Sequence, residues 1–151
     1  MAFYLDGLQD PGNLGTIIRI ADWFGMEFLF CSPGTADIYN PKVIQASMGS
    51  FCRVKTVYAS FNDVVSMANR SGIEVYGAFM DGKSIYSSRL TDNAIIVLGN
   101  EGNGISENTA EKITTRLSIP SFSTGKSCAE SLNVAIAAGI IGSEFRRQAI
   151  R

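Results

Sequence analysis

The sequence contains no histidine and only three cysteines, so the commonest side chains of metal sites and of general bases are scarce. Without histidine the usual general base is missing. The cysteines, Cys31, Cys52 and Cys128, are far apart and form no CxxC pair. This pattern argues against a zinc site, and we expect no bound metal. An odd number of scattered cysteines indicates reduced thiols in a cytoplasmic protein rather than a disulfide framework.

The sequence also lacks a long apolar segment and an excess of positive charge. Residues 136–141 are apolar but far too few to cross a membrane. The first residues of the chain lack the basic start of a signal peptide. Because the formal net charge is −1, any contact with a nucleic acid has to use a local patch rather than a general positive field.

What the sequence does contain fits one compact domain of 151 residues, with 46% hydrophobic and 18% charged residues. Strand-like runs alternate with helical patterns, without a repeat or a linker, which predicts an α/β fold with a mainly parallel sheet. Strands are expected at residues 2–8, 26–31, 51–58, 73–79, 94–98 and 116–119, with a turn at Asp81-Gly82 after the fourth. Helices are expected at residues 14–24, 41–48, 61–70, 106–113 and 134–142.

Ligands of such sheets bind beyond the carboxyl ends of the strands, where three polar or glycine-rich loops are expected: residues 9–13, 99–104 and 121–127. The second loop does not fit the GxGxxG dinucleotide fingerprint and follows a late strand. The third lacks the upstream glycine of a phosphate-binding loop, because position 120 is proline. Taken alone, residues 99–104 are better explained as a tight turn.

Polar residues gather at the start of the first predicted helix. Asn13 is expected to cap this helix, and Gly15 is expected to allow a close approach. Arg19 follows one and a half turns later. An exposed arginine in a salt bridge is the simplest interpretation, but its apolar neighbours favour a functional role.

The last third of the chain combines polar residues with an unusual helix. Residues 134–142 are apolar on every side, so we expect this helix to be buried. Glu130, Ser131 and Asn133 precede it, where free N–H groups and the positive end of the helix dipole face a ligand. The segment fits a binding site, and it fits equally a capping box followed by a core helix.

Three motifs in this order resemble those of the SpoU/TrmH-type RNA ribose methyltransferases of the SPOUT superfamily. They are DPGNLGTIIR at residues 10–19, IVLGNEGNGI at 96–105, and IP at 119–120 followed by ESLNVA at 130–135. Residues 121–129 form a longer loop than is usual in that family. The resemblance covers nearly all of residues 1–151, which it implies to be one methyltransferase domain. Because family members often carry an N-terminal RNA-binding domain, we expect either a minimal enzyme or a fragment of a longer one.

The resemblance implies a fold that composition does not show, a Rossmann-like parallel sheet whose C-terminal segment threads a deep trefoil knot. It implies S-adenosyl-L-methionine as the cofactor and a homodimer that packs through the C-terminal helix. The implied activity is methyl transfer to a ribose 2′-hydroxyl in rRNA or tRNA, in the cytoplasm, with RNA as the partner and without a membrane or a metal.

The resemblance also assigns residues by their place in the motifs, together with Ala78 at the end of the fourth expected strand. Those with implied catalytic roles are Asn13, Arg19, Glu101, Ser131 and Asn133. Those implied to bind the cofactor are Ala78, Leu98, Gly99, Asn100, Gly102, Ile119, Ser131 and Leu132. In the family's proposed mechanism the arginine activates the ribose hydroxyl, which conflicts with the rule that arginine stays protonated. Arg19 has a second candidate role, in which it grips a phosphate beside the target ribose.

Two other functions remain open. A knotted dimer that binds RNA or cofactor without turnover would share this fold, although the complete set of polar motif residues argues against it. A nucleotide-dependent oxidoreductase would instead bind NAD, and a comparison of the two cofactors would identify it.

Overall fold

The structure, a computed structural model, describes residues 1–123 and 130–150. Its strands are β1 (Ala2–Leu5), β2 (Phe28–Cys31), β3 (Lys55–Tyr58), β4 (Glu74–Ser84), β5 (Ala94–Leu98) and β6 (Thr115–Ser118). They form one sheet in the order β3-β2-β1-β5-β4-β6, in which every neighbouring pair is parallel. The prediction of a mainly parallel α/β sheet is therefore confirmed.

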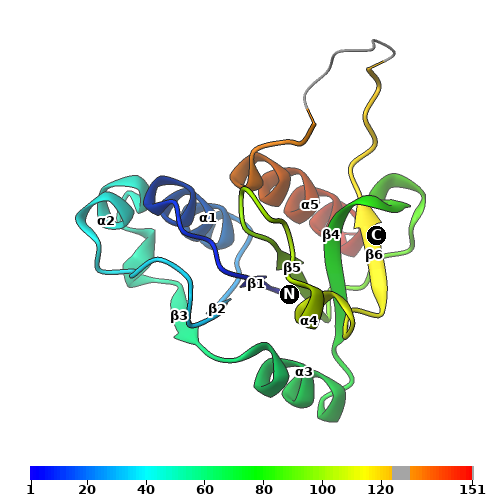
Figure 1. Cartoon of the computed structure of the whole chain (residues 1–151), viewed down its shortest axis with the longest axis horizontal. Helices are drawn as coiled ribbons and strands as arrows, with labels where there is room; N and C mark the ends of the chain where they lie inside the picture. The colour runs from blue at the N-terminus through cyan, green and yellow to red at the C-terminus, as the bar shows by residue number, and fades with distance from the viewer. Residues whose placement is uncertain (124–129, 151) are drawn as a thin grey trace.

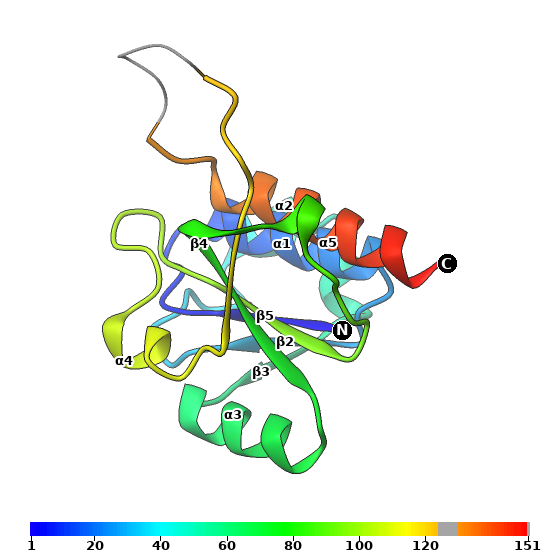
Figure 2. The ribbon, with the colours of Figure 1, turned by 90° about the vertical axis from the view of Figure 1, so that its right-hand side faces the viewer.

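The helices cover the two faces of this sheet. They are α1 (Pro11–Trp23), α2 (Pro41–Ser47), α3 (Phe61–Arg70), α4 (Glu107–Ala110) and α5 (Val134–Ala149), with 3-10 turns η1 (Ser50–Cys52) and η2 (Ile85–Ser87). Figures 1 and 2 show α1, α2 and α5 on one face and α3 on the other. Alternate residues of β1 serve the two cores, since Phe3 and Leu5 pack with α1 and α5, whereas Tyr4 packs on Phe61 of α3.

The start of α1 differs from the prediction that Asn13 caps it. The cap is Asp10, whose Oδ1 accepts a hydrogen bond of 2.7 Å from the backbone N–H of Asn13. Pro11 occupies the first helical position, where its fixed φ and missing N–H suit a helix start. The helix therefore begins three residues earlier than expected, and the Asn13 side chain is released for other contacts.

The predicted end of the fourth strand is also wrong. Instead of turning at Asp81-Gly82, β4 continues to Ser84 along β6. Ala78 and Lys83 both pair with Leu117, so residues 79–82 are an insertion within a continuous strand. The third predicted strand is shorter than expected, because its first residues form η1 instead of pairing.

The helix α5 is longer than predicted and is not buried on every side. Ala138, Ile141 and Phe145 lie in the core, whereas Ile136 on the opposite face is 56% exposed. The C-terminal half adds Glu144, whose carboxylate receives two hydrogen bonds from Arg147. The described residues therefore leave the outer face of α5 uncovered at the apolar side chain of Ile136.

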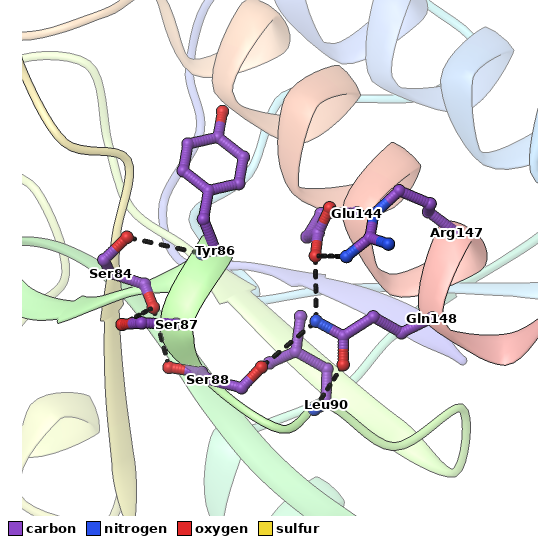
Figure 3. A network of polar contacts seen from close by, with 8 residues as sticks. All are labelled: Ser84, Tyr86, Ser87, Ser88, Leu90, Glu144, Arg147 and Gln148. Carbon is purple, nitrogen blue, oxygen red and sulfur yellow. Dashed lines mark hydrogen bonds and ion pairs between the residues drawn. The ribbon is translucent and has the colours of Figure 1, made fainter. Parts of the chain in front are cut away.

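A polar network fixes the C-terminal half of α5 to the segment after β4 (Figure 3). Gln148 Nε2 donates to the Ser88 carbonyl and to Glu144 Oε1, and Gln148 Oε1 accepts from the backbone N–H of Leu90. The carboxylate of Glu144 is buried with these partners, as a buried charge requires. This network thus sets the direction of α5 at its C-terminal end, and the N-cap residue Asn133 sets it at the start.

Several expected properties can be compared with the described residues. Cys31 and Cys52 are free thiols, and burial raises the pKa of Cys31 to about 12; Cys128 lies outside the described residues. In the part of the chain that the structure describes, no group of acidic, cysteine or histidine side chains is arranged to hold a metal. None of its helices has the length and apolar character needed to span a membrane.

The contact between α1 and α2 depends on Gly15, and the predicted close approach at this residue is confirmed. A Cβ at position 15 would lie 2.6 Å from both Ala46 Cβ and the Val43 carbonyl oxygen. We expect Gly15→Ala to lower the free energy of unfolding, because overpacking costs about 1–3 kcal/mol and helix propensity returns at most about 1 kcal/mol. Urea denaturation measures this change. The control is Gly34→Ala, whose Cβ meets nothing within 4 Å. Equal urea midpoints for the two variants would contradict the packing argument.

Candidate active site

A cavity of about 640 Å³ lies at the carboxyl edge of the sheet, beyond β5 and β6. Its walls come from the loops at residues 99–104 and 130–133, from β4 and from the first turns of α5. All eight residues that the resemblance implies for cofactor binding contribute to its lining: Ala78, Leu98, Gly99, Asn100, Gly102, Ile119, Ser131 and Leu132. Segments distant in the sequence thus meet around one space.

The loop after β5 is a tight turn that is also a wall of the cavity. Asn100 and Gly104 form a two-way backbone bridge, with N–H to carbonyl distances of 2.9 Å in both directions. Gly104 has φ +68°, and a Cβ on Gly99 would lie 2.2 Å from the Gly104 carbonyl carbon. The glycines are therefore needed for the fold of the loop itself, and the backbone it presents to the cavity is rigidly placed.

The side chains of this loop also tie it to the end of β1. Asn100 Nδ2 donates to the Gly7 carbonyl at 2.8 Å, while its Oδ1 accepts from the N–H groups of Gly102 and Asn103. Asp6 Oδ2 accepts from both the N–H and the hydroxyl of Ser106, each at 2.8 Å. The cavity wall is thus held by the central strand of the sheet.

Three residues implied to be catalytic form one chain of hydrogen bonds. Asn13 Nδ2 donates to Glu101 Oε1 at 3.2 Å, and Asn13 Oδ1 accepts from Asn133 Nδ2 at 3.0 Å. Asn133 Oδ1 in turn accepts from the N–H groups of Ala135 and Ile136, so it is the N-cap of α5. In both Asn13 and Asn133, the NH₂ group donates to one neighbour and the oxygen accepts from another. These bonds fix the orientation of both side-chain amides.

The other two residues implied to be catalytic stand apart from this chain. Ser131 is exposed and borders the cavity, without a hydrogen bond to a described residue. Arg19 is exposed on α1, does not line the cavity, and makes neither a hydrogen bond nor an ion pair with any residue that the structure describes. The salt-bridge interpretation of Arg19 therefore finds no partner among those residues.

Several residues at the site were not anticipated from the sequence. Asp10 caps α1 and its N–H donates to Glu101 Oε1 at 3.2 Å, a role that the Asp-Pro pair at a helix start could have indicated. Phe79, Met80 and Leu117 add apolar lining, but their place depends on the insertion in β4, for which we found no signal. The predicted contacts of residues 124–129 lie outside the described residues.

The described residues that line the cavity include two acidic side chains, Glu101 and Glu130, and no basic one. The remaining described lining is apolar, hydroxyl or amide. A site with this lining favours a ligand with cationic groups and an apolar body over a ligand with several negative charges.

Comparison with known proteins agrees with the motifs, because residues 1–143 match the sequence profile of the SpoU rRNA Methylase family. The chain belongs to this family. A 23S rRNA (guanosine(2553)-2′-O)-methyltransferase, RlmP, from Bacillus subtilis is 36% identical over 94% of this chain and 56% of its own length. A 23S rRNA (guanosine-2′-O-)-methyltransferase, RlmB, from Neisseria meningitidis is 34% identical over 97% of this chain and 58% of its own.

Solved structures agree with the fold. The SpoU methyltransferase AviRb from Streptomyces viridochromogenes, in complex with the cofactor AdoMet, has a TM-score of 0.88 and 31% identity over 99% of this chain and 60% of its own. A TrmH-family protein from Porphyromonas gingivalis has a TM-score of 0.88 and 50% identity over 97% of this chain and 59% of its own. The chain thus spans little more than half the length of these relatives.

The capping role of Asn133 can be tested separately from its hydrogen bond to Asn13. We expect Asn133→Ala to lower the free energy of unfolding by about 1 kcal/mol, because the cap is lost. Asn133→Asp should recover most of that loss, since a carboxylate caps well and suits the helix dipole, although it cannot donate to Asn13. Chemical denaturation tests both, with the exposed Ser131→Ala as the control. If Asn133→Ala is no less stable than Ser131→Ala, the cap contributes nothing.

Proposed function

We propose that this chain transfers a methyl group from S-adenosyl-L-methionine to the 2′-hydroxyl of a ribose in rRNA or tRNA. The observation that carries the proposal is that the second and third family motifs line one cavity, and that Asn13 of the first motif is hydrogen-bonded to a lining residue of each, Glu101 and Asn133. Residues 1–151 would form one methyltransferase domain. The relatives named for 2′-O-methylation of 23S rRNA support the same reaction class.

The lining of the cavity supports S-adenosyl-L-methionine as its ligand. This cofactor carries a sulfonium and an ammonium group, which suit the carboxylates of Glu101 and Glu130. Its adenine ring suits the apolar part of the lining, where Leu98, Ile119 and Leu132 contribute. The pyrophosphate of NAD would meet the same carboxylates unfavourably, which counts against the oxidoreductase alternative. The AdoMet complex of AviRb, a structural neighbour, supports this assignment.

The residues of the site would act mainly by placing the two reactants. When bound, the cofactor supplies a methyl group on a positively charged sulfur, and the ribose oxygen must approach it in line, so positioning accounts for much of the rate. The carbon–oxygen bond forms as the carbon–sulfur bond breaks, S-adenosylhomocysteine leaves, and the hydroxyl proton passes to solvent water. The hydrogen-bonded amides of Asn13 and Asn133 would keep Glu101 and the start of α5 in place at one edge of the cavity. The Ser131 hydroxyl, exposed at the same edge, is a further hydrogen-bonding group for the ribose.

Arg19 would hold the RNA rather than take a proton. Its guanidinium is exposed and has no partner among the described residues, so binding a phosphate would not require breaking an ion pair. A guanidinium stays protonated and matches phosphate in a bidentate manner, which suits a grip beside the target ribose. We therefore assign Arg19 to the substrate and the cavity loops to the cofactor.

The finer features of the family belong to the same proposal. A homodimer through α5 is supported by the uncovered face of that helix, where Ile136 is exposed next to a shallow hollow at Gly139 and Ile140. A trefoil knot is supported by three features of the described residues: β6 is an edge strand of the sheet, Ile119, Ser121 and Ser123 line the same cavity as residues 99–104, and α5 packs on α1. An enzyme acting on rRNA or tRNA would work in the cytoplasm.

The reaction is tested by incubating the chain with tritiated S-adenosyl-L-methionine and unmodified rRNA or tRNA transcripts, followed by mapping of ribose methylation. We expect Arg19→Ala to lose methyl transfer and to keep its affinity for S-adenosylhomocysteine. Helix propensity changes little, so the fold should survive. Arg19→Lys should also be slowed, on the order of a hundredfold, if positioning is what the guanidinium provides.

The control is Arg70→Ala, an exposed arginine at the end of α3 on the opposite face of the sheet. Near-normal single-turnover rates for Arg19→Ala would show that this arginine is not part of the catalytic machinery. Cofactor binding by the unaltered chain without any methyl transfer would favour the binding module instead.

The proposed dimer predicts a change of mass in one surface variant. Ile136→Asp should convert a particle of twice 16.3 kDa into one of 16.3 kDa, because it places a charge in an apolar contact. Ile136 is 56% exposed in the single chain, so the fold should tolerate the change. Light scattering measures the masses, and Met48→Asp, an exposed apolar residue after α2, is the control. A monomeric unaltered chain would contradict the dimer.

A further inference from the structure

The insertion in β4 forms a wall of the cavity that the family motifs do not include. Residues 79–82 leave the strand between two positions that both pair with Leu117. Phe79 and Met80, from the start of this insertion, line the cavity next to Ala78. The insertion is therefore a feature of the site, although it lies outside all three motifs.

The end of the insertion is held in place by contacts with β6. A Cβ on Gly82 would lie 2.5 Å from the Leu117 carbonyl carbon, so the two backbones are in direct contact. The Ser118 hydroxyl donates to the Gly82 carbonyl at 2.7 Å. These contacts fix Gly82, at the end of the insertion. The beginning of the insertion is fixed by side chains.

Arg116 of β6 fixes that beginning. Its guanidinium carbon lies 3.6 Å from the centre of the Phe79 ring, a cation–π contact, and its Nη2 lies 2.6 Å from Asp81 Oδ1. The hydrogen bond from Arg116 lowers the pKa of Asp81, which agrees with this pairing. One side chain thus holds both residues that flank Met80.

Met80 itself has little cover within the chain. Its side chain is 68% exposed although it borders the cavity and lies between two restrained neighbours. Methionine is flexible and polarisable, so it adapts to the face of an aromatic ring or to a thioether. A ligand in the cavity would cover this side chain, and no described part of the chain does so.

We propose that Met80 contacts the cofactor bound in the cavity and that Arg116 is a positioning residue, which holds residues 79–82 where Met80 can make this contact. The inference rests on the proposed function, because it takes S-adenosyl-L-methionine as the ligand. An RNA phosphate fits Arg116 less well, since its guanidinium is already engaged by Phe79 and Asp81 and the Asp81 carboxylate would repel a phosphate.

The test is titration of the full chain with S-adenosylhomocysteine by calorimetry, alongside methyl-transfer kinetics. Met80→Ala should weaken binding about tenfold, the loss expected for one covered apolar side chain. Arg116→Ala should weaken it several-fold, and Arg116→Lys, which keeps the charge and the reach to Asp81, should lose less. In all three variants the KM for S-adenosyl-L-methionine should rise in step with the loss of affinity, and by a larger factor than kcat falls.

A double variant identifies the positioning role. If Arg116 acts through Met80, Arg116→Ala should have little further effect on affinity once Met80→Ala is present, so the two losses will not add. The matched control is Lys83→Ala, which removes an exposed cation directly after the insertion and should leave binding normal. Additive losses would overturn the positioning role of Arg116.

Gly99→Ala separates this inference from the proposal on which it rests, because its Cβ would distort the loop at residues 99–104 and should abolish binding. If Gly99→Ala loses binding while Met80→Ala and Arg116→Ala bind as the unaltered chain does, the inference is wrong and the proposed function stands. If the unaltered chain does not bind S-adenosylhomocysteine, or if Gly99→Ala binds it normally, the assignment of the cavity fails together with the inference.

Discussion

The side chain of Asn13 connects the start of α1 to two segments that line the cavity. It donates to Glu101 from the loop after β5 and accepts from Asn133 at the start of α5. Because Asp10 caps the start of α1, the Asn13 side chain is not needed as a cap and can make both contacts. Loss of this amide would remove the hydrogen bond between the first and third motifs and leave the bond from the Asp10 N–H to Glu101 as a link between the first and second.

The apolar core and the polar site depend on each other. α5 is directed by its core residues and by the Gln148 network at one end, and by its Asn133 cap at the other. The loop after β5 is likewise tied to β1 through Asp6 and Asn100. Rigid elements therefore supply the site.

The sequence predicted those parts of the fold that depend on local patterns. The ranges expected for α3 and β5 agree with the structure, because α3 is bounded by a serine cap and a glycine and β5 is wholly apolar between polar neighbours. The residues named from the second and third motifs line one cavity, whereas Asn13 and Arg19 of the first motif do not line it. The insertion in β4 could not be predicted, since it is defined by pairing with Leu117, more than thirty residues later. The contact of Arg116 with Phe79 arises from the same long-range pairing.

The bond between Asn13 and Asn133 joins residues 120 positions apart in the sequence. Contacts of such long range form late, because the loop between them must first be ordered. During synthesis, the first motif leaves the ribosome well before its partner has been made. A chain interrupted before residue 133 could build much of the sheet yet would present no complete cavity, so occupancy of the cavity reports that the whole domain has folded.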